Sequence, residues 1–222
     1  MASRLKRVRT RLRKLVPGLF VFGRVLGLVY SKRSFLRNAG YFRSVRLKQP
    51  VRADGSPLPW MTYSVISFLE KRLKPDFTVF EFGSGNSTLF FASLVSKVVS
   101  VECERSWYEH VRKTLPANVQ LLLCEPYRRE DYLAHLTGQG REFDVIIVDA
   151  EDREACLRVA PTRLSARGVI LLDDADRPAY AEEGGRLCAS GFKRLDFVGL
   201  KPAGINAYTT AVFYRPNNAL GL

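Results

Sequence analysis

The stretch Val79–Phe91, VFEFGSGNSTLFF, places two glycines directly after a hydrophobic run that is typical of a buried strand. Gly83 and Gly85 permit a sharp turn and the close approach of a ligand to the backbone. A dinucleotide-binding turn has a third glycine, where this chain carries the hydroxyl residues Ser87 and Thr88. The lysine of a phosphate-binding P-loop is also missing here. The turn therefore favours a ligand that lacks a pyrophosphate.

A carboxylate follows this turn at the spacing that an adenosine-type ligand requires. Glu102 ends the apolar run VVSVE, twenty-one residues after Glu81. An acid at the end of the second strand can accept hydrogen bonds from both ribose hydroxyls. A solvated surface acid is the alternative, but the preceding residues are those of a buried strand, whose carboxyl end faces the ligand crevice. The turn and Glu102 together indicate an adenosyl-ribose site.

Three more acids end two later apolar runs. Asp149 follows FDVIIV, and Asp173 and Asp174 follow GVILL. Neighbouring parallel strands would bring these carboxylates to one rim, where their mutual repulsion requires a cation, a proton or a basic partner. Oxygen ligands suit Mg²⁺ or Ca²⁺, and such an ion lowers the pKa of a bound hydroxyl. Alternatively, Arg153 and Arg177 neutralise the acids, the Asp pair caps its loop and Asp149 binds a cofactor amine.

The elements expected to position these residues alternate between strand and helix. A helix over 60–73 leads into strands at 77–82, 98–102, 119–123, 144–149 and 168–173, with helices near 87–96, 105–115, 128–137, 153–164 and 178–190. The runs 191–200 and 207–215 follow one another without a helix and must pair antiparallel. The sequence thus predicts an α/β fold: a doubly wound, mostly parallel seven-stranded sheet with helices on both faces and a C-terminal antiparallel β-hairpin.

These segments (EFGSGNSTLFFA, VVSVE, FDVIIVDA and GVILLDD) and the final hairpin resemble class I S-adenosylmethionine-dependent methyltransferases over about residues 60–215. The resemblance implies that the first turn faces the methionine end of S-adenosylmethionine and that the acid after strand two holds the ribose. The matching cofactor-binding residues are Glu81, Gly83, Ser84, Gly85 and Glu102, with Glu125 near the adenine. Ser87 stands where the family commonly has a third glycine, and it is a further cofactor-binding candidate. Trp107 either covers the cofactor or packs in the core, and we favour the core.

The pattern VDA…LDD is also similar to that of cation-dependent O-methyltransferases, which implies a magnesium ion held by Asp149, Asp173 and Asp174. With a hydroxyl acceptor, Asp149, Asp152 or Asp174 would act as the base, and Asp149 and Asp174 are the catalytic candidates. The expected activity is methyl transfer to a small-molecule, lipid-linked or sugar-linked acceptor, with a hydroxyl as the expected methyl-accepting group. The alternatives are an NAD-dependent oxidoreductase and a non-catalytic binding protein on the same fold. His110 and His135 are expected to be structural.

The net charge of +13 belongs to one end of the chain. Residues 1–52 hold fifteen Lys/Arg and no acid, whereas residues 53–222 hold twenty Lys/Arg and twenty-two acids. We therefore divide the chain into a basic, partly amphipathic N-terminal extension (1–52) and a catalytic domain (53–222), separated by the Pro/Gly loop 50–59. A nearly neutral catalytic part argues against nucleic acid as the partner.

Residues 15–30 carry apolar side chains at helical spacing, interrupted by Pro17 and three glycines. The run is shorter than the ~20 residues of a membrane span. One interpretation is that residues 1–30 bind an anionic membrane surface. The others are a basic tail with a helix packed on the domain, and a mitochondrial transit peptide. Four widely spaced cysteines indicate reduced thiols and a cytoplasmic protein, with peripheral membrane association as an option.

Overall fold

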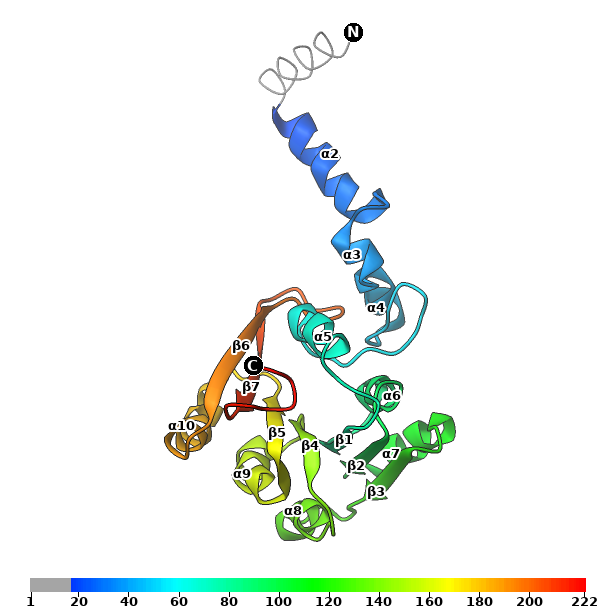
Figure 1. Ribbon diagram of the computed structural model, residues 1–222. Helices are drawn as coiled ribbons and strands as arrows, with labels where there is room; N and C mark the ends of the chain where they lie inside the picture. The colour runs from blue at the N-terminus through cyan, green and yellow to red at the C-terminus, as the bar shows by residue number, and fades with distance from the viewer. Residues whose placement is uncertain (1–16) are drawn as a thin grey trace.

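The computed structural model describes residues 17–222 and contains one seven-stranded sheet in the order β3-β2-β1-β4-β5-β7-β6 (Figure 1). The strands are β1 (Thr78–Phe82), β2 (Lys97–Glu102), β3 (Val119–Leu123), β4 (Phe143–Val148), β5 (Leu164–Leu172), β6 (Lys193–Gly199) and β7 (Tyr208–Tyr214). β1 to β5 pair in parallel, and β7 runs antiparallel to both β5 and β6. The predicted fold class is confirmed, and the hairpin distinguishes this sheet from the all-parallel dinucleotide fold.

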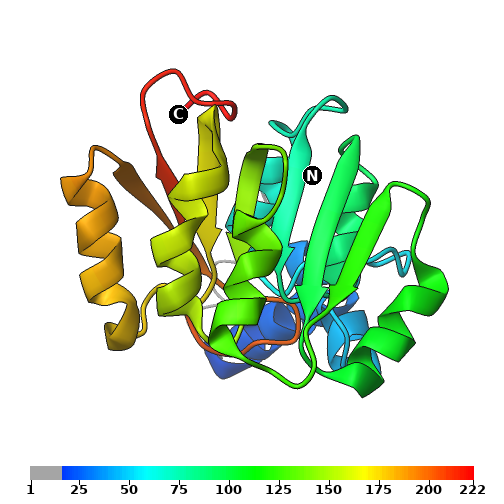
Figure 2. The same cartoon turned by 90° about the horizontal axis from the view of Figure 1, so that it is seen from below.

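Helices cover both faces of the sheet (Figures 1 and 2). They are α5 (Tyr63–Glu70), α6 (Asn86–Ala92), α7 (Arg105–Val111), α8 (Arg129–Thr137), α9 (Arg153–Val159) and α10 (Ala181–Ala189). Side chains alternate along each strand, so β1 sends Phe80 and Phe82 to one face and Val79 to the other. The first face packs against α8, α9 and α10, and the second against α5 and α6. Each apolar layer thereby holds the strand ends in fixed register.

The element boundaries differ from the predicted ones by a few residues. The helix expected over 60–73 is confined to Tyr63–Glu70, and those expected to reach 115 and 164 end in 3₁₀ turns at Arg112–Thr114 and Ala160–Arg163. β5 begins at Leu164 rather than 168. Helix ends fray and often close in a 3₁₀ turn, so periodicity places an element more reliably than its last residues.

The N-terminal extension forms three helices within the described residues: α2 (Pro17–Tyr30), α3 (Phe35–Asn38) and α4 (Tyr41–Leu47). The last of them is tied to the loop that follows, because the Ser44 hydroxyl donates to the Val51 carbonyl (2.9 Å) and accepts from its amide (3.0 Å). α2 projects away from the sheet (Figure 1). Among residues 17–222, no helix is long and apolar enough to cross a membrane. The division at residue 52 stays a prediction.

Candidate active site

The glycine turn after β1 is shaped by contacts that only glycine tolerates. Gly83 has φ +102°, and a Cβ there would lie 2.5 Å from the carbonyl oxygen of Asp149. Its amide donates to the Val101 carbonyl (2.9 Å), so the turn is held between β2 and the end of β4. Gly85, at φ +151°, starts α6. The missing Cβ of Gly83 therefore lets the turn pack directly against the end of β4, at the carboxyl edge of the sheet where ligands bind in such folds.

Glu81 lies behind this turn and is 1% exposed. Its carboxylate accepts hydrogen bonds from Thr88 Oγ1 (2.6 Å) and Ser100 Oγ (2.8 Å), and Thr88 Oγ1 in turn accepts from the Gly85 amide (3.0 Å). Thr88 thus caps α6. Glu81, predicted to bind the cofactor, is placed where it supports the turn from the core side. Ser87 lines a cavity in front of it.

Burial raises the pKa of Glu81 from 4.5 to about 7, although its hydroxyl partners oppose the shift. Its native pKa exceeds its unfolded value, so the stabilisation that its protonated form provides is lost as pH rises from about 4.5 to 7. The stability of the native protein relative to Glu81→Gln should therefore fall by about 3 kcal/mol across this window. Urea unfolding of both proteins at several pH values measures this difference. The contributions of other titrating groups cancel because both proteins carry them. A pH-independent difference would contradict the assignment.

Glu102 is oriented toward the turn by three hydrogen bonds. One carboxylate oxygen accepts from the Ser84 hydroxyl (2.7 Å), and the other accepts from the amides of Cys103 (2.9 Å) and Glu104 (3.0 Å). A carboxylate has about four acceptor positions, so at least one stays available to a ligand. The Ser84 hydroxyl, with its own lone pairs, lies beside it. This pair can hold a diol, as predicted for the ribose.

Three adjoining cavities lie along this edge of the sheet, and all three are lined in part by Asp149. The turn cavity, about 440 Å³, is lined by Gly83, Ser84, Glu102, Asp149, Ala150 and Glu151 among others. The lysine cavity, about 280 Å³, is formed by Trp60, Asp149, Arg153, Asp173, Asp174, Lys201 and Tyr208. The tryptophan cavity, about 330 Å³, includes Trp60, Trp107, His110, Ser87 and Lys48. Asp149 is thus the point where the three spaces meet.

The predicted carboxylate cluster forms, but side-chain cations neutralise it. The ammonium of Lys201, a residue only 5% exposed, donates to both Asp173 and Asp174. Arg153 pairs with Asp149 (2.7 Å) and lies 3.5 Å from Asp174. In the described part of the chain no group of three or more His, Cys, Asp or Glu side chains could hold a metal ion. The predicted magnesium site is therefore not supported, because ammonium and guanidinium groups stand where the ion would have balanced the charge.

These contacts determine which side chains of the lysine cavity are charged. Burial, with the charge of Asp149, raises the pKa of Asp173 to about 6, and Lys201 opposes the rise. Burial acts in the same direction on Asp174, but hydrogen bonds and ion pairs with Lys201 and arginines hold its pKa below its ordinary value. Burial opposes the charge of Lys201, yet the two aspartates raise its pKa overall. Lys201 is consequently a fixed cation rather than a proton acceptor.

The sequence pattern did not identify Lys201, because it lies in the turn between β6 and β7, 27 residues after Asp174. It also misplaced Trp107. This side chain is 39% exposed, and its indole NH donates to the Ser84 carbonyl (2.9 Å). Its ring stacks on that of His110, with the ring centroids 5.2 Å apart. Trp107 and His110 therefore belong to the wall of the tryptophan cavity, and the prediction of a core tryptophan is wrong. Its indole sits over Gly85, which has room for it.

The remaining predicted site residues lie elsewhere. Glu125 pairs with Arg105 and lines none of the three cavities, so its predicted contact with the adenine stays a prediction. Asp152 accepts from Arg129 and also lies outside them. His135 is on α8, away from the cavities. The predicted neutralisation of Asp174 by Arg177 is confirmed at 2.6 Å.

Several solved methyltransferase structures are similar to this chain in fold. An rRNA methylase from Streptococcus thermophilus matches with a TM-score of 0.53 and 18% identity, over 68% of this chain and 96% of the other. The chain has the class I methyltransferase fold. The precorrin-6y C5,15-methyltransferase of Geobacter metallireducens matches with a TM-score of 0.53 and 15% identity over 68% and 87% of the two chains. A methyltransferase-like protein from Silicibacter pomeroyi matches at 0.52 and 19% over 73% and 90%.

No protein-family model matches the sequence, and neither does any curated protein. The relationship is therefore one of fold, with sequence identities below 20% in these three structures.

Proposed function

We propose that this chain transfers a methyl group from S-adenosylmethionine to a hydroxyl group of a small-molecule, lipid-linked or sugar-linked acceptor. The observation that carries the proposal is the position of Asp149 in the walls of all three cavities. A donor in the turn cavity and an acceptor in the lysine cavity would meet at this carboxylate. The shared fold supports the reaction class.

The residues of the turn cavity fit S-adenosylmethionine. Gly83 and Ser84 bring the backbone of the turn to the cavity wall, and Glu102 with Ser84 offers acceptors for the ribose hydroxyls. Four acids line the cavity (Glu102, Glu104, Asp149 and Glu151) against two arginines (Arg153 and Arg177), and this negative balance suits a sulfonium. When bound, this cofactor supplies an activated methyl group. The chain itself has to align the acceptor with it and remove a proton.

Asp149 is the proposed general base. Burial raises its pKa, an effect that Arg153 opposes, and a raised pKa makes the carboxylate a better acceptor of the hydroxyl proton. Arg153 also donates to the Ala150 carbonyl (3.0 Å), which fixes the segment after β4. Asp174, the other catalytic candidate, is held by Lys201 and Arg177. Its lowered pKa makes it a weak base, so its proposed role is to position Lys201 beside the acceptor.

Replacing Glu102 by alanine is expected to weaken S-adenosylmethionine binding by about 10–100-fold, because charge-assisted hydrogen bonds to the ribose are lost. Titration calorimetry measures this with the wild type, E102A and the control E109A, whose carboxylate pairs with Arg112 outside the cavities. E109A should bind like the wild type. Tight binding of NADH together with no response to S-adenosylmethionine would replace this proposal by the oxidoreductase alternative.

A further inference from the structure

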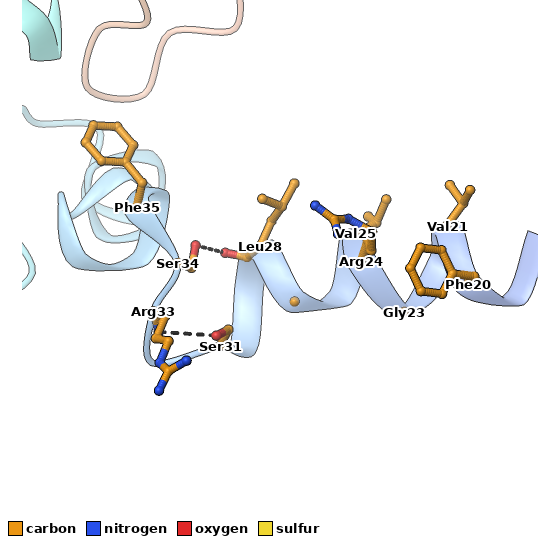
Figure 3. A pocket seen from close by; sticks show the side chains of 11 residues that line it. Phe20, Val21, Gly23, Arg24, Val25, Leu28, Ser31, Arg33, Ser34 and Phe35 are labelled. Atoms are coloured by element: carbon orange, nitrogen blue, oxygen red, sulfur yellow. Dashed lines mark hydrogen bonds between the residues drawn. The ribbon is translucent and has the colours of Figure 1, made fainter. Parts of the chain in front are cut away.

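The face of α2 that carries Val21, Phe22, Val25, Leu26, Leu28 and Val29 is exposed to solvent. The exposed fractions of these side chains run from 38% to 59%. At 100° per residue they fall on one side of the helix, whereas Gly23, Arg24 and Gly27 fall on the other. Figure 3 shows Val21, Val25 and Leu28 extending from the same side of α2, beside an open hollow that Phe35 of α3 also lines. We call these six side chains the apolar stripe.

The extension that carries the apolar stripe is rich in basic residues and holds no acid. The exposed cations of the described extension are Arg24, Lys32, Arg33, Arg37, Arg46 and Lys48. Residues 1–14 of the sequence add seven more Lys/Arg. A surface that buries the stripe must therefore tolerate or attract a strongly positive segment. A second copy of the chain would bring fifteen like charges against fifteen, whereas an anionic lipid surface complements both the charge and the apolar side chains.

We call α2 and α3 together the arm. Specific contacts join the arm to the domain. Arg37 donates to the Tyr30 carbonyl (2.8 Å) and Asn38 to the Lys32 carbonyl (3.1 Å), so the C-terminal end of α2 is held on α3. The ring of Phe35 packs edge-on against Tyr63 of α5 at 5.6 Å. These contacts give the arm a defined origin on the catalytic domain.

The arm also leaves the domain at the edge that holds the cavities. In Figure 2 the arrowheads of the parallel strands point toward the blue N-terminal segment. The Asn86 side chain donates to the Pro50 carbonyl (2.9 Å), and Lys48 and Pro50 line the tryptophan cavity. Two exposed apolar side chains lie at the same edge: Trp60, which lines two of the cavities, and Ile205, in the β6–β7 turn and 82% exposed. A surface that binds the arm would therefore face the site.

We propose that the apolar stripe and its basic residues dock the chain on an anionic membrane surface, with the stripe lying in the headgroup layer. This interaction surface stands independently of the proposed methyl transfer. If both hold, the cavities open toward the bilayer, and the acceptor would be presented from a lipid headgroup.

Flotation with vesicles tests the docking surface directly. The full chain is mixed with vesicles of phosphatidylcholine alone or with phosphatidylglycerol added, and S-adenosylmethionine binding is measured in parallel by calorimetry. Two double variants carry the same added charge: V21D/V25D places it on the stripe, and G23D/G27D places it on the opposite face, where a Cβ meets nothing within 4 Å. We expect binding to the anionic vesicles that weakens at high salt. V21D/V25D should bind at least about tenfold more weakly than G23D/G27D, because apolar burial is lost.

Equal binding of the two double variants, or no binding of the wild type to anionic vesicles, would overturn the proposal. If the wild type self-associates without lipid and the V21D/V25D variant is a monomer, the stripe binds a second copy of the chain instead. S-adenosylmethionine affinity should be the same in all these proteins. If the wild type does not bind S-adenosylmethionine but does bind anionic vesicles, the proposed function is refuted and the docking surface is not.

Discussion

Replacing Asp149 by asparagine is expected to lower kcat for methyl transfer by about 10²–10⁴-fold, the usual contribution of a general base. The amide keeps the size and shape of the carboxylate but cannot accept the hydroxyl proton. Arg153 retains its contacts with Asp174 (3.5 Å) and with the Asp173 carbonyl, so the rim should keep its shape. S-adenosylmethionine affinity should change little, because the proposed ribose contacts are on Glu102.

The measurement is a single-turnover rate of S-adenosylhomocysteine formation across a range of pH. The wild-type rate should fall at low pH, as the carboxylate takes up a proton, and the D149N rate should lack that limb. D152N is the matched control, because Asp152 pairs with Arg129 outside the cavities. An unchanged rate in D149N, or an equal loss in D152N, would show that the base lies elsewhere.

Replacing Lys201 by methionine is expected to lower the free energy of unfolding by about 3–5 kcal/mol near pH 8, the cost of removing one partner from a buried ion pair. The side chains of Lys201 and Asp173 are 7% and 3% exposed, so water cannot replace the ammonium. The Thr210 hydroxyl, which donates to Asp173 at 2.9 Å, would be its one remaining side-chain hydrogen-bond donor in the described structure. Methionine keeps the apolar stem but removes the ammonium, whose nitrogen lies 5.0 Å from the centroid of the Tyr208 ring.

The loss should shrink as the pH is lowered. The native pKa of Asp173 is about 6, above its unfolded value, so protonation favours the native state as pH falls through 6. Removing Lys201 would raise this pKa further, so in K201M the protonation of native Asp173 begins at a higher pH. Urea unfolding at pH 5 and pH 8 measures both values. R177M is the control: Arg177 pairs with Asp174 but is 57% exposed, so its removal should cost less than about 1 kcal/mol. Equal losses in K201M and R177M would contradict a buried lysine.

The sequence alone determined the features that depend on local pattern. Short apolar runs that alternate with helical runs indicated the parallel sheet, and the absence of a helix between residues 200 and 207 indicated the closing hairpin. Gly83 and Asp149 come at strand ends, and parallel strands end at one edge, so their convergence was predictable. The same logic identified Glu102, whose neighbours form a buried strand.

Only the tertiary structure decided which partners these residues have. Lys201 reaches Asp173 because β7 lies beside β5 in the sheet, an arrangement between residues 28 positions apart that no local spacing reports. That contact replaces the expected magnesium ion. Likewise, Glu81 is buried and accepts hydrogen bonds from Thr88 and Ser100, and Trp107 covers Gly85 rather than filling the core. Local pattern predicts where backbone turns, whereas the direction and charge balance of a side chain depend on neighbours that are distant in sequence.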